Sequence, residues 1–139
     1  FTRETEFISL RRDDEYALYD GEICSSDTGC VPITEYRRMT NEHVVAHSTS
    51  KHCKVNRSSY MVGALARWNN SHDKLCDVAL DAAKRLGLAP GCHNPYMNTI
   101  AQVVEAGHCA LDAVAIIDTS YTPGSITVTI GISYFVANS

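Results

Sequence analysis

The chain has 139 residues and a hydrophobic fraction of 45%, which suit one domain, residues 1–139, with a core of its own. Its net charge is −4, which argues against broad binding to a phosphate backbone, and we expect no nucleic-acid partner. There is no run of about 18 apolar residues, so we expect no membrane span. No single reaction can be read from this sequence.

The first part of the chain is polar and weakly patterned. Short strands are predicted at Glu6–Leu10 and at Glu15–Tyr19. Turn residues fill the interval between Cys24 and Cys30, so a bond between these cysteines would pin a surface loop. The segment His43–His47 fits a strand or a helix equally.

Helical periodicity governs the middle of the chain. A first helix is predicted over Ser58–Trp68, and a second runs from its N-cap Asn70 to Leu86. Gly87 suits the position that follows the second helix. The apolar side of the second helix is made of small and aliphatic residues: Leu75, Cys76, Ala79, Leu80, Ala82, Ala83 and Leu86.

The last part of the chain predicts a helix and then a hairpin. The helix starts at Asn94-Pro95, a cap and a first-turn proline, and stops at Gly107. Cys109–Ile117 is an apolar run and predicts a strand. A turn at Thr122-Pro123-Gly124 and the alternation over Ile126–Tyr134 complete an antiparallel hairpin. The expected fold is an α+β sandwich, an antiparallel sheet packed against two or three helices.

Six cysteines are spread over both halves of the chain: Cys24, Cys30, Cys53, Cys76, Cys92 and Cys109. An even number predicts a disulfide framework, which in turn predicts a secreted, extracellular protein. Sequence alone does not select among the possible pairings. We expect at least one bridge between helices and sheet, and a bond from Cys76 to Cys109 fits that expectation. A structural zinc site is the alternative, but it requires a second close cysteine pair.

Two further features are consistent with secretion. Asn56-Arg57-Ser58 and Asn69-Asn70-Ser71 match the N-glycosylation acceptor pattern, which makes Asn56 and Asn69 candidate glycosylation sites. The dibasic pairs Arg11-Arg12 and Arg37-Arg38 are interpreted either as processing sites of a secreted precursor or as plain surface charge.

The histidines are the candidates for chemistry. His43 and His47, four residues apart, project to one side of either a helix or a strand. Two imidazoles on one face suit acid–base catalysis or zinc binding, with Glu42 or His52 as a further ligand. A secreted ribonuclease would pair two such histidines with a cation near the phosphate. Basic residues that could supply this cation lie nearby: Arg37, Arg38 and Lys51. The H-E-x-x-H pattern of zinc proteases is absent, so the alternative is a set of solvated loop histidines, and we predict no metal site and no cofactor.

Two short stretches near the C-terminus carry a resemblance to a known family. Ala106–Leu111 reads A-G-H-C-A-L, and Gly124–Thr129 reads G-S-I-T-V-T. They are similar to the Gly-x-Cys step and the closing strand of small secreted cysteine-rich proteins of the killer-toxin type, which include fungal effectors. The resemblance implies a secreted α/β sandwich that acts as a toxin or effector. The closing cysteine of that family is missing, and no individual functional residue carries over.

The sequence therefore predicts a secreted toxin or effector that binds a protein or cell-surface target on a competitor or host cell. One alternative is a small secreted hydrolase, nuclease-like, that uses His43 and His47. Another is a subunit of a secreted assembly, because an edge strand near the C-terminus offers unpaired backbone groups to a partner strand.

Overall fold

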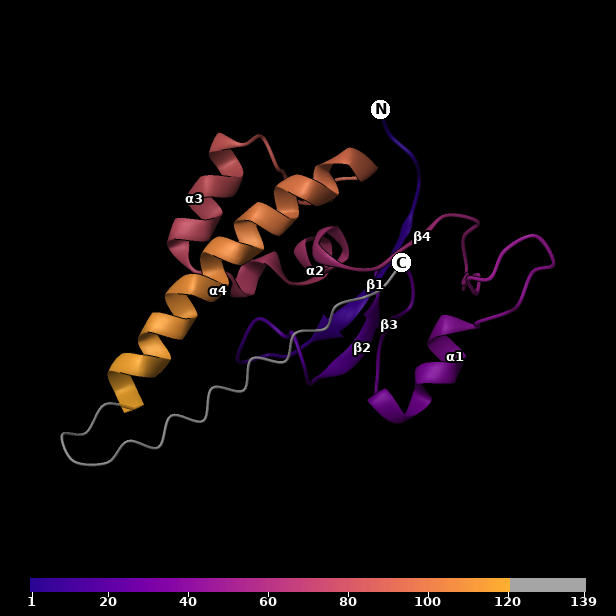
Figure 1. The fold of residues 1–139 in the computed structure, drawn as a ribbon, viewed down its shortest axis with the longest axis horizontal. Helices are drawn as coiled ribbons and strands as arrows, with labels where there is room; N and C mark the ends of the chain where they lie inside the picture. The colour runs from indigo at the N-terminus through magenta and orange to yellow at the C-terminus, as the bar shows by residue number, and fades with distance from the viewer. Residues whose placement is uncertain (121–139) are drawn as a thin grey trace.

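The computed structural model describes residues 1–120, in which a small sheet lies beside a layer of helices (Figure 1). Within these residues, all four strands precede the three helices of this layer along the chain, and one short helix lies between the third and fourth strands. In chain order the strands and α-helices are β1 (Glu6–Arg11), β2 (Glu22–Ser25), β3 (Gly29–Val31), α1 (Tyr36–Thr40), β4 (Tyr60–Met61), α2 (Ala64–Ser71), α3 (Asp77–Arg85) and α4 (Asn98–Ser120). Short 3-10 turns precede α1, α3 and α4 at Ile33–Glu35, His72–Lys74 and Pro95–Met97.

The sheet is mixed, with strand order β3-β2-β1-β4. β1 pairs antiparallel with β2, and β2 with β3, whereas β1 and β4 run parallel, with Glu6 opposite Tyr60 and Phe7 opposite Met61. The α+β class is confirmed, but the sheet is not antiparallel throughout. The long connection between β3 and β4 lets β4 return in the same direction as β1, which a tight hairpin cannot do.

Strand β1 contributes side chains to two hydrophobic cores, one on each face of the sheet. Its prediction at Glu6–Leu10 is confirmed, with one more residue, Arg11. Successive side chains point to opposite faces. Phe7 therefore packs into the main core with the helices, and Ile8 joins a smaller core with Ile23 and Met39 on the other face.

The second predicted strand is wrong. Glu15–Tyr19 lies in the irregular loop between β1 and β2, yet Tyr16 and Ala17 are buried there. Two residues of this segment thus contribute to the interior from a loop. The loop closes at Gly21, where φ is +140° and a Cβ atom would lie 2.6 Å from the Arg11 carbonyl oxygen.

The helices begin later than the sequence predicts. The first predicted helix, from Ser58, begins at Ala64 because Tyr60 and Met61 add a strand to the sheet. The second begins at Asp77 rather than after Asn70, since α2 continues through Ser71. Its predicted end is confirmed: Gly87 follows α3 with φ of +74°.

Helix α4 differs most from expectation. Its start is confirmed, because the Asn94 side chain accepts a hydrogen bond from the Tyr96 amide at the Pro95 turn. It does not stop at Gly107, and the predicted strand Cys109–Ile117 is helical up to Ser120. A single helical glycine costs only about 1 kcal/mol relative to alanine, which the surrounding alanines offset. The predicted turn 122–124 and strand 126–134 lie outside the described residues.

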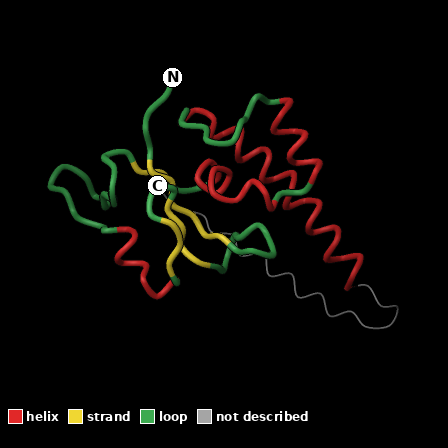
Figure 2. Tube along the Cα trace, turned by 180° about the vertical axis from the view of Figure 1, so that it is seen from behind, coloured by secondary structure: helices red, strands yellow, loops and turns green. Residues whose placement is uncertain are grey.

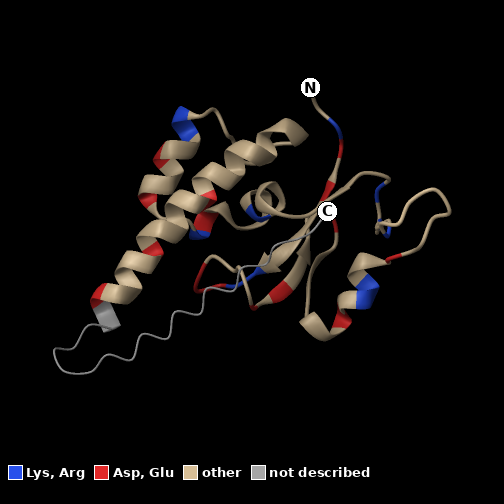
Figure 3. Ribbon diagram, viewed as in Figure 1, with Lys and Arg blue, Asp and Glu red and all other residues tan. Residues whose placement is uncertain are grey.

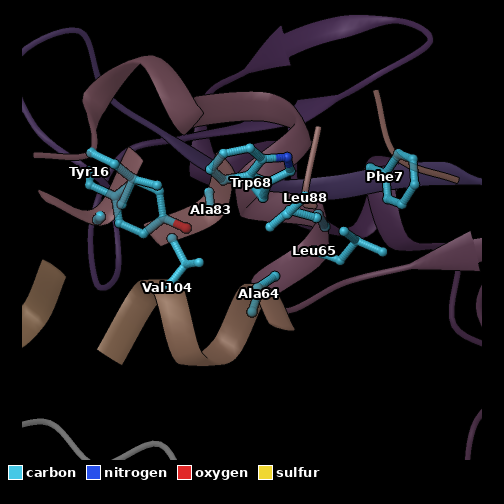
Figure 4. Packing of buried hydrophobic residues seen from close by; sticks show 12 residues of the cluster. Phe7, Tyr16, Ala64, Leu65, Trp68, Ala83, Leu88 and Val104 are labelled. Atoms are coloured by element: carbon cyan, nitrogen blue, oxygen red, sulfur yellow. The ribbon is translucent and has the colours of Figure 1, made fainter. Parts of the chain in front are cut away.

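The main core lies between the sheet and the helical layer (Figure 4). Leu65 of α2 has no exposed surface, and Trp68 beside it donates a 3.1 Å hydrogen bond from Nε1 to the Ala89 carbonyl. Val104 of α4 packs against this cluster from the opposite side. The second half of α4 extends past the other helices (Figures 1 and 2).

Candidate functional site

Three histidines meet in the irregular segment between α1 and β4. His43 and His52 exchange both backbone hydrogen bonds at 2.9 Å, so their side chains share one face of a short bridge. Their ring centroids lie 6.1 Å apart, and the His47 ring lies 5.5 Å from that of His52. All three side chains are exposed. The structure thus places His52 between the two predicted candidates.

No set of three metal-ligating side chains converges among residues 1–120. Within the cluster, the His43 ring contacts the Asn41 carbonyl at 3.4 Å. Glu42, the predicted third ligand, turns away and bonds to the Tyr36 hydroxyl and the Lys51 ammonium. The histidines form a solvated surface group, and a hydrolytic role for His43 and His47 stays a prediction.

A pocket of about 570 Å³ lies beside this histidine group. Its walls come from α1 and from the segment that follows: Tyr36, Arg37, Thr40, Asn41, Glu42 and Lys51. Hydrogen bonds from Tyr36 and Lys51 lower the pKa of Glu42, and the same bond to Glu42 raises the pKa of Tyr36. Two of the predicted cations therefore line the pocket, although Lys51 is already paired with a carboxylate.

The cysteines do not form the predicted framework. Cys24 and Cys30 stand opposite each other on β2 and β3 and are joined by a disulfide, as the turn between them predicted. The other four are free thiols: Cys53, Cys76, Cys92 and Cys109. The expected bridge between helices and sheet is absent among them. Cys109 lies within a helix rather than at the start of a strand, so the geometric premise of a Cys76–Cys109 bridge is wrong.

The side chains of the two candidate glycosylation sites make hydrogen bonds within the fold. The Asn56 side-chain amide donates 2.8 Å to Glu6, and that of Asn69 donates 3.0 Å to the Cys92 carbonyl. These are the nitrogen atoms that would carry a glycan. A glycan at either site would therefore be attached to a nitrogen that already makes an internal hydrogen bond.

Three of the four dibasic residues lie in regular structure, and Arg12 directly follows β1. Arg11 ends β1 and forms an ion pair with Asp73 at 3.1 Å, while Arg12 pairs with Asp14 at 2.8 Å. Arg37 and Arg38 belong to α1. Both pairs are interpreted as structural or surface charge in the folded chain.

Sequence reasoning missed a charged cluster inside the helical layer. Arg67 of α2 binds Glu105 of α4 with two parallel contacts, Nε to Oε1 at 2.5 Å and Nη2 to Oε2 at 2.7 Å. The Tyr16 hydroxyl donates to the same carboxylate at 2.9 Å. We call these three residues the Glu105 clamp. It joins α2, α4 and the loop before β2, and its members are 38 and 89 residues apart, so no local spacing could reveal it.

Burial shapes the protonation states around the Glu105 clamp. The Glu105 side chain is 14% exposed and that of Arg67 is 26% exposed. Burial, followed by the Glu105 charge, raises the pKa of Tyr16, which keeps the hydroxyl a hydrogen-bond donor. Burial and the same carboxylate raise the pKa of the Cys109 thiol one turn further along α4. The arrangement favours a neutral Cys109 thiol and a fixed ion pair between Arg67 and Glu105. Such groups stabilise the fold rather than react.

A second buried carboxylate fixes the sheet. Glu6 has no exposed surface and accepts hydrogen bonds from Ser25, from the Asn56 amide groups and from the Arg57 backbone. Burial alone would raise the pKa of Glu6, but these hydrogen bonds outweigh it and hold the pKa below its usual value. Glu6 therefore anchors the segment before β4 as an ion.

The end of α4 is an exposed apolar surface. Residues 110–118, which we call the α4 overhang, are all exposed, and three aliphatic side chains stand out: Leu111 at 43%, Val114 at 54% and Ile117 at 53%. Charge on the described part of α4 is acidic only, at Glu105, Asp112 and Asp118 (Figure 3). By length and composition alone, Pro95–Asp118 could cross a membrane, a test that core helices of other proteins also pass.

Comparison with known proteins gives one informative similarity. No family model and no solved structure matches the chain. The chain is 33% identical over 108 residues to the alpha subunit of sulfhydrogenase 1 from Pyrococcus furiosus. The match covers 77% of this chain and 25% of that subunit, so the chain spans about a quarter of the length of this curated relative.

Proposed function

We propose that the chain is a structural segment of an oxidoreductase subunit of the sulfhydrogenase alpha kind. The observation that carries the proposal is the 33% identity, which extends over 77% of the chain rather than over one short motif. In this role the chain supplies scaffold to a larger subunit. The sulfhydrogenase activity belongs to the relative as a whole, of which the matched part is 25%.

The described geometry supports a scaffold role. The charged interior groups are paired with each other, Arg67 with Glu105, or with backbone and amide groups, as at Glu6. Such paired groups fix the arrangement of elements and leave few polar atoms available for chemistry. The α4 overhang presents apolar surface of the kind that marks a contact with more protein.

The other functions that the sequence suggested stay predictions. Secretion and a toxin or effector role rested on six paired cysteines and on a resemblance near the C-terminus, and only Cys24 and Cys30 are bonded. The nuclease-like alternative retains its exposed histidines, with Arg37 and Lys51 in the neighbouring pocket. The idea of an assembly subunit fits the similarity best, without the secreted setting.

A hybrid subunit tests the proposal. The part of the Pyrococcus furiosus alpha subunit that matches this chain is replaced by the whole of this chain, residues 1–139, and the hybrid is produced with the relative's other components. We expect a soluble hybrid that retains measurable sulfhydrogenase activity. The measurement is activity per unit of purified protein, beside the unaltered relative.

Two matched variants of the hybrid show whether the fold of this segment matters. Glu105→Gln removes one charge of the Glu105 clamp, whereas Asp81→Asn removes a carboxylate of α3 that is 58% exposed. We expect Glu105→Gln to lower the thermal stability of the hybrid more than Asp81→Asn does. A hybrid that accumulates as folded protein but has no activity would contradict the proposed function.

A further inference from the structure

The α4 overhang is largely apolar, and Asp112 and Asp118 are its only charged residues. Residues 110–118 read A-L-D-A-V-A-I-I-D, and each of them is exposed. Leu111, Val114 and Ile117 lie three residues apart and follow one face, while the alanines between them offer close approach on the others. A contiguous apolar surface of this kind marks a contact with more protein or with a membrane.

A membrane does not fit this helix. The α4 overhang extends only roughly 14 Å at about 1.5 Å per residue, and a span needs about 30 Å. A span would therefore have to include the first half of α4, where Ala101 and Val104 are buried in the main core. That half also holds Glu105 in its ion pair with Arg67. The described part of α4 carries no Lys or Arg that would anchor it at an anionic lipid surface.

The relative contains further protein that could contact the α4 overhang. Three quarters of the sulfhydrogenase alpha relative lies outside the region that matches this chain. The first half of α4 is already covered by α2 and α3, so a longer subunit would meet this segment along the half that projects past them (Figure 1). A contact there would bury the aliphatic side chains and would face the carboxylate of Asp112.

We propose that the α4 overhang docks into an apolar cleft formed by the parts of a sulfhydrogenase-alpha-like subunit that this chain does not contain. The cleft is lined by aliphatic side chains and carries a basic group or backbone amides opposite Asp112, because a carboxylate entering an apolar contact needs such a partner. The inference rests on the proposed function and deepens it, since it names the surface through which the segment joins the rest of the subunit.

Thiol labelling of the hybrid subunit tests this contact. Val114→Cys places a thiol on the α4 overhang, and Val78→Cys is the matched control, an exposed valine of α3 at 65% against 54%. N-ethylmaleimide labelling is read at each site by peptide mass, in the isolated chain and in the active hybrid. We expect similar labelling rates in the isolated chain, and in the hybrid a loss of about tenfold or more at position 114 only, because thiol reactivity requires access.

The possible outcomes separate this inference from the proposed function. An active hybrid in which position 114 still labels as in the isolated chain overturns the docking inference and leaves the proposed function standing. Equal protection at positions 78 and 114 also overturns it, since the contact would not be specific to α4. An inactive hybrid contradicts the proposed function, and the inference that rests on it falls too.

Two measurements on the isolated chain distinguish other occupants. Sedimentation would show a dimer, reversed by Val114→Asp, if a second copy covers the α4 overhang. Flotation with vesicles of phosphatidylcholine and phosphatidylglycerol would capture the chain, again dependent on Val114, if a lipid surface covers it. Either result overturns the inference; a chain that neither dimerises nor floats, together with protection in the hybrid, supports it.

Discussion

The two halves of α4 are one continuous helix with two different surroundings. Residues 98–109 pack against α2 and α3, bury Ala101 and Val104, and hold the Glu105 clamp. Residues 110–118 contain Leu111, Val114 and Ile117 and are exposed throughout. The exposed half is at least as apolar as the buried one. What decides burial along this helix is therefore which elements lie beside it, and the sequence of the helix by itself cannot say that.

The two halves also differ in the polarity of their exposed sides. A core-facing helix normally carries a polar face on the solvent side. The first half of α4 does so, with Gln102 and Thr99 exposed, whereas the α4 overhang exposes Leu111, Val114 and Ile117 beside its two aspartates. Within residues 1–120, the larger exposed aliphatic side chains of α4 therefore gather mainly on the α4 overhang.

The largest effect on stability is expected from a comparison of two valines, one on each half of α4. Val104→Asp puts a carboxylate at a position that is 2% exposed, and we expect it to lower the free energy of unfolding by about 4 kcal/mol or more, because no partner is available there. Val114→Asp, at 54% exposure, should change it by less than about 0.5 kcal/mol in the isolated chain. Urea denaturation followed by circular dichroism measures both. Equal losses would mean that the α4 overhang is already covered.

The sequence was informative where a local rule decides the structure. The strand at Glu6, the turn between Cys24 and Cys30, the Asn94 cap and the Gly87 helix end all follow from one to six neighbouring residues, and each is confirmed.

The sequence was misleading where contact with a distant element decides the local structure. Tyr60 and Met61 continue a helical pattern but pair with β1, which precedes them by more than 50 residues. The run 109–117 is short and apolar, which periodicity cannot assign to strand or helix, and continuity with the packed half of α4 makes it helical. The Glu105 clamp and the Glu6 anchor stayed invisible for the same reason: their partners come from other elements.

The next test compares two carboxylates two turns apart on α4. Glu105→Gln leaves Arg67 half-buried without its counter-charge, and we expect a loss of about 2–3 kcal/mol in the free energy of unfolding, discounted for the partial exposure of the pair. Asp112→Asn on the α4 overhang is the control and should be neutral in the isolated chain. A double variant with Arg67→Met should recover part of the loss, since it removes the unpaired charge. No recovery would argue against the ion pair as the cause.

Alkaline pH tests the hydrogen bond from Tyr16 to Glu105 on the packed half of α4. Burial, then the Glu105 charge, raises the pKa of Tyr16, so the folded chain keeps this hydroxyl protonated when the unfolded chain ionises it near pH 10. Its stabilising contribution is present below pH 10 and is lost above it, by about 1.4 kcal/mol per pH unit. Tyr16→Phe should cost about 1–2 kcal/mol at pH 8 and should flatten the decline between pH 10 and 11.

The control for this test is Tyr19→Phe, which alters a tyrosine of the same loop that is 72% exposed. It should leave both the stability and its slope with pH unchanged. Burial also raises the pKa of Tyr60, so part of the alkaline decline should persist in Tyr16→Phe. A slope identical to that of the parent chain would mean that Tyr16 is not protected from ionisation as the structure indicates.

The smallest expected effect lies at the junction of the two halves. Gly107 has open space where a Cβ atom would lie, and its backbone is helical. Gly107→Ala should therefore stabilise the chain by about 0.5–1 kcal/mol, since alanine loses less conformational entropy in a helix. Helix content by circular dichroism should rise slightly. If the helix instead ended at Gly107, as the sequence alone predicts, the substitution would destabilise the chain, because a helix-terminating glycine commonly adopts a left-handed conformation that alanine resists. The sign of this one small change thus decides whether the two halves of α4 are a single helix, on which the whole comparison between them depends.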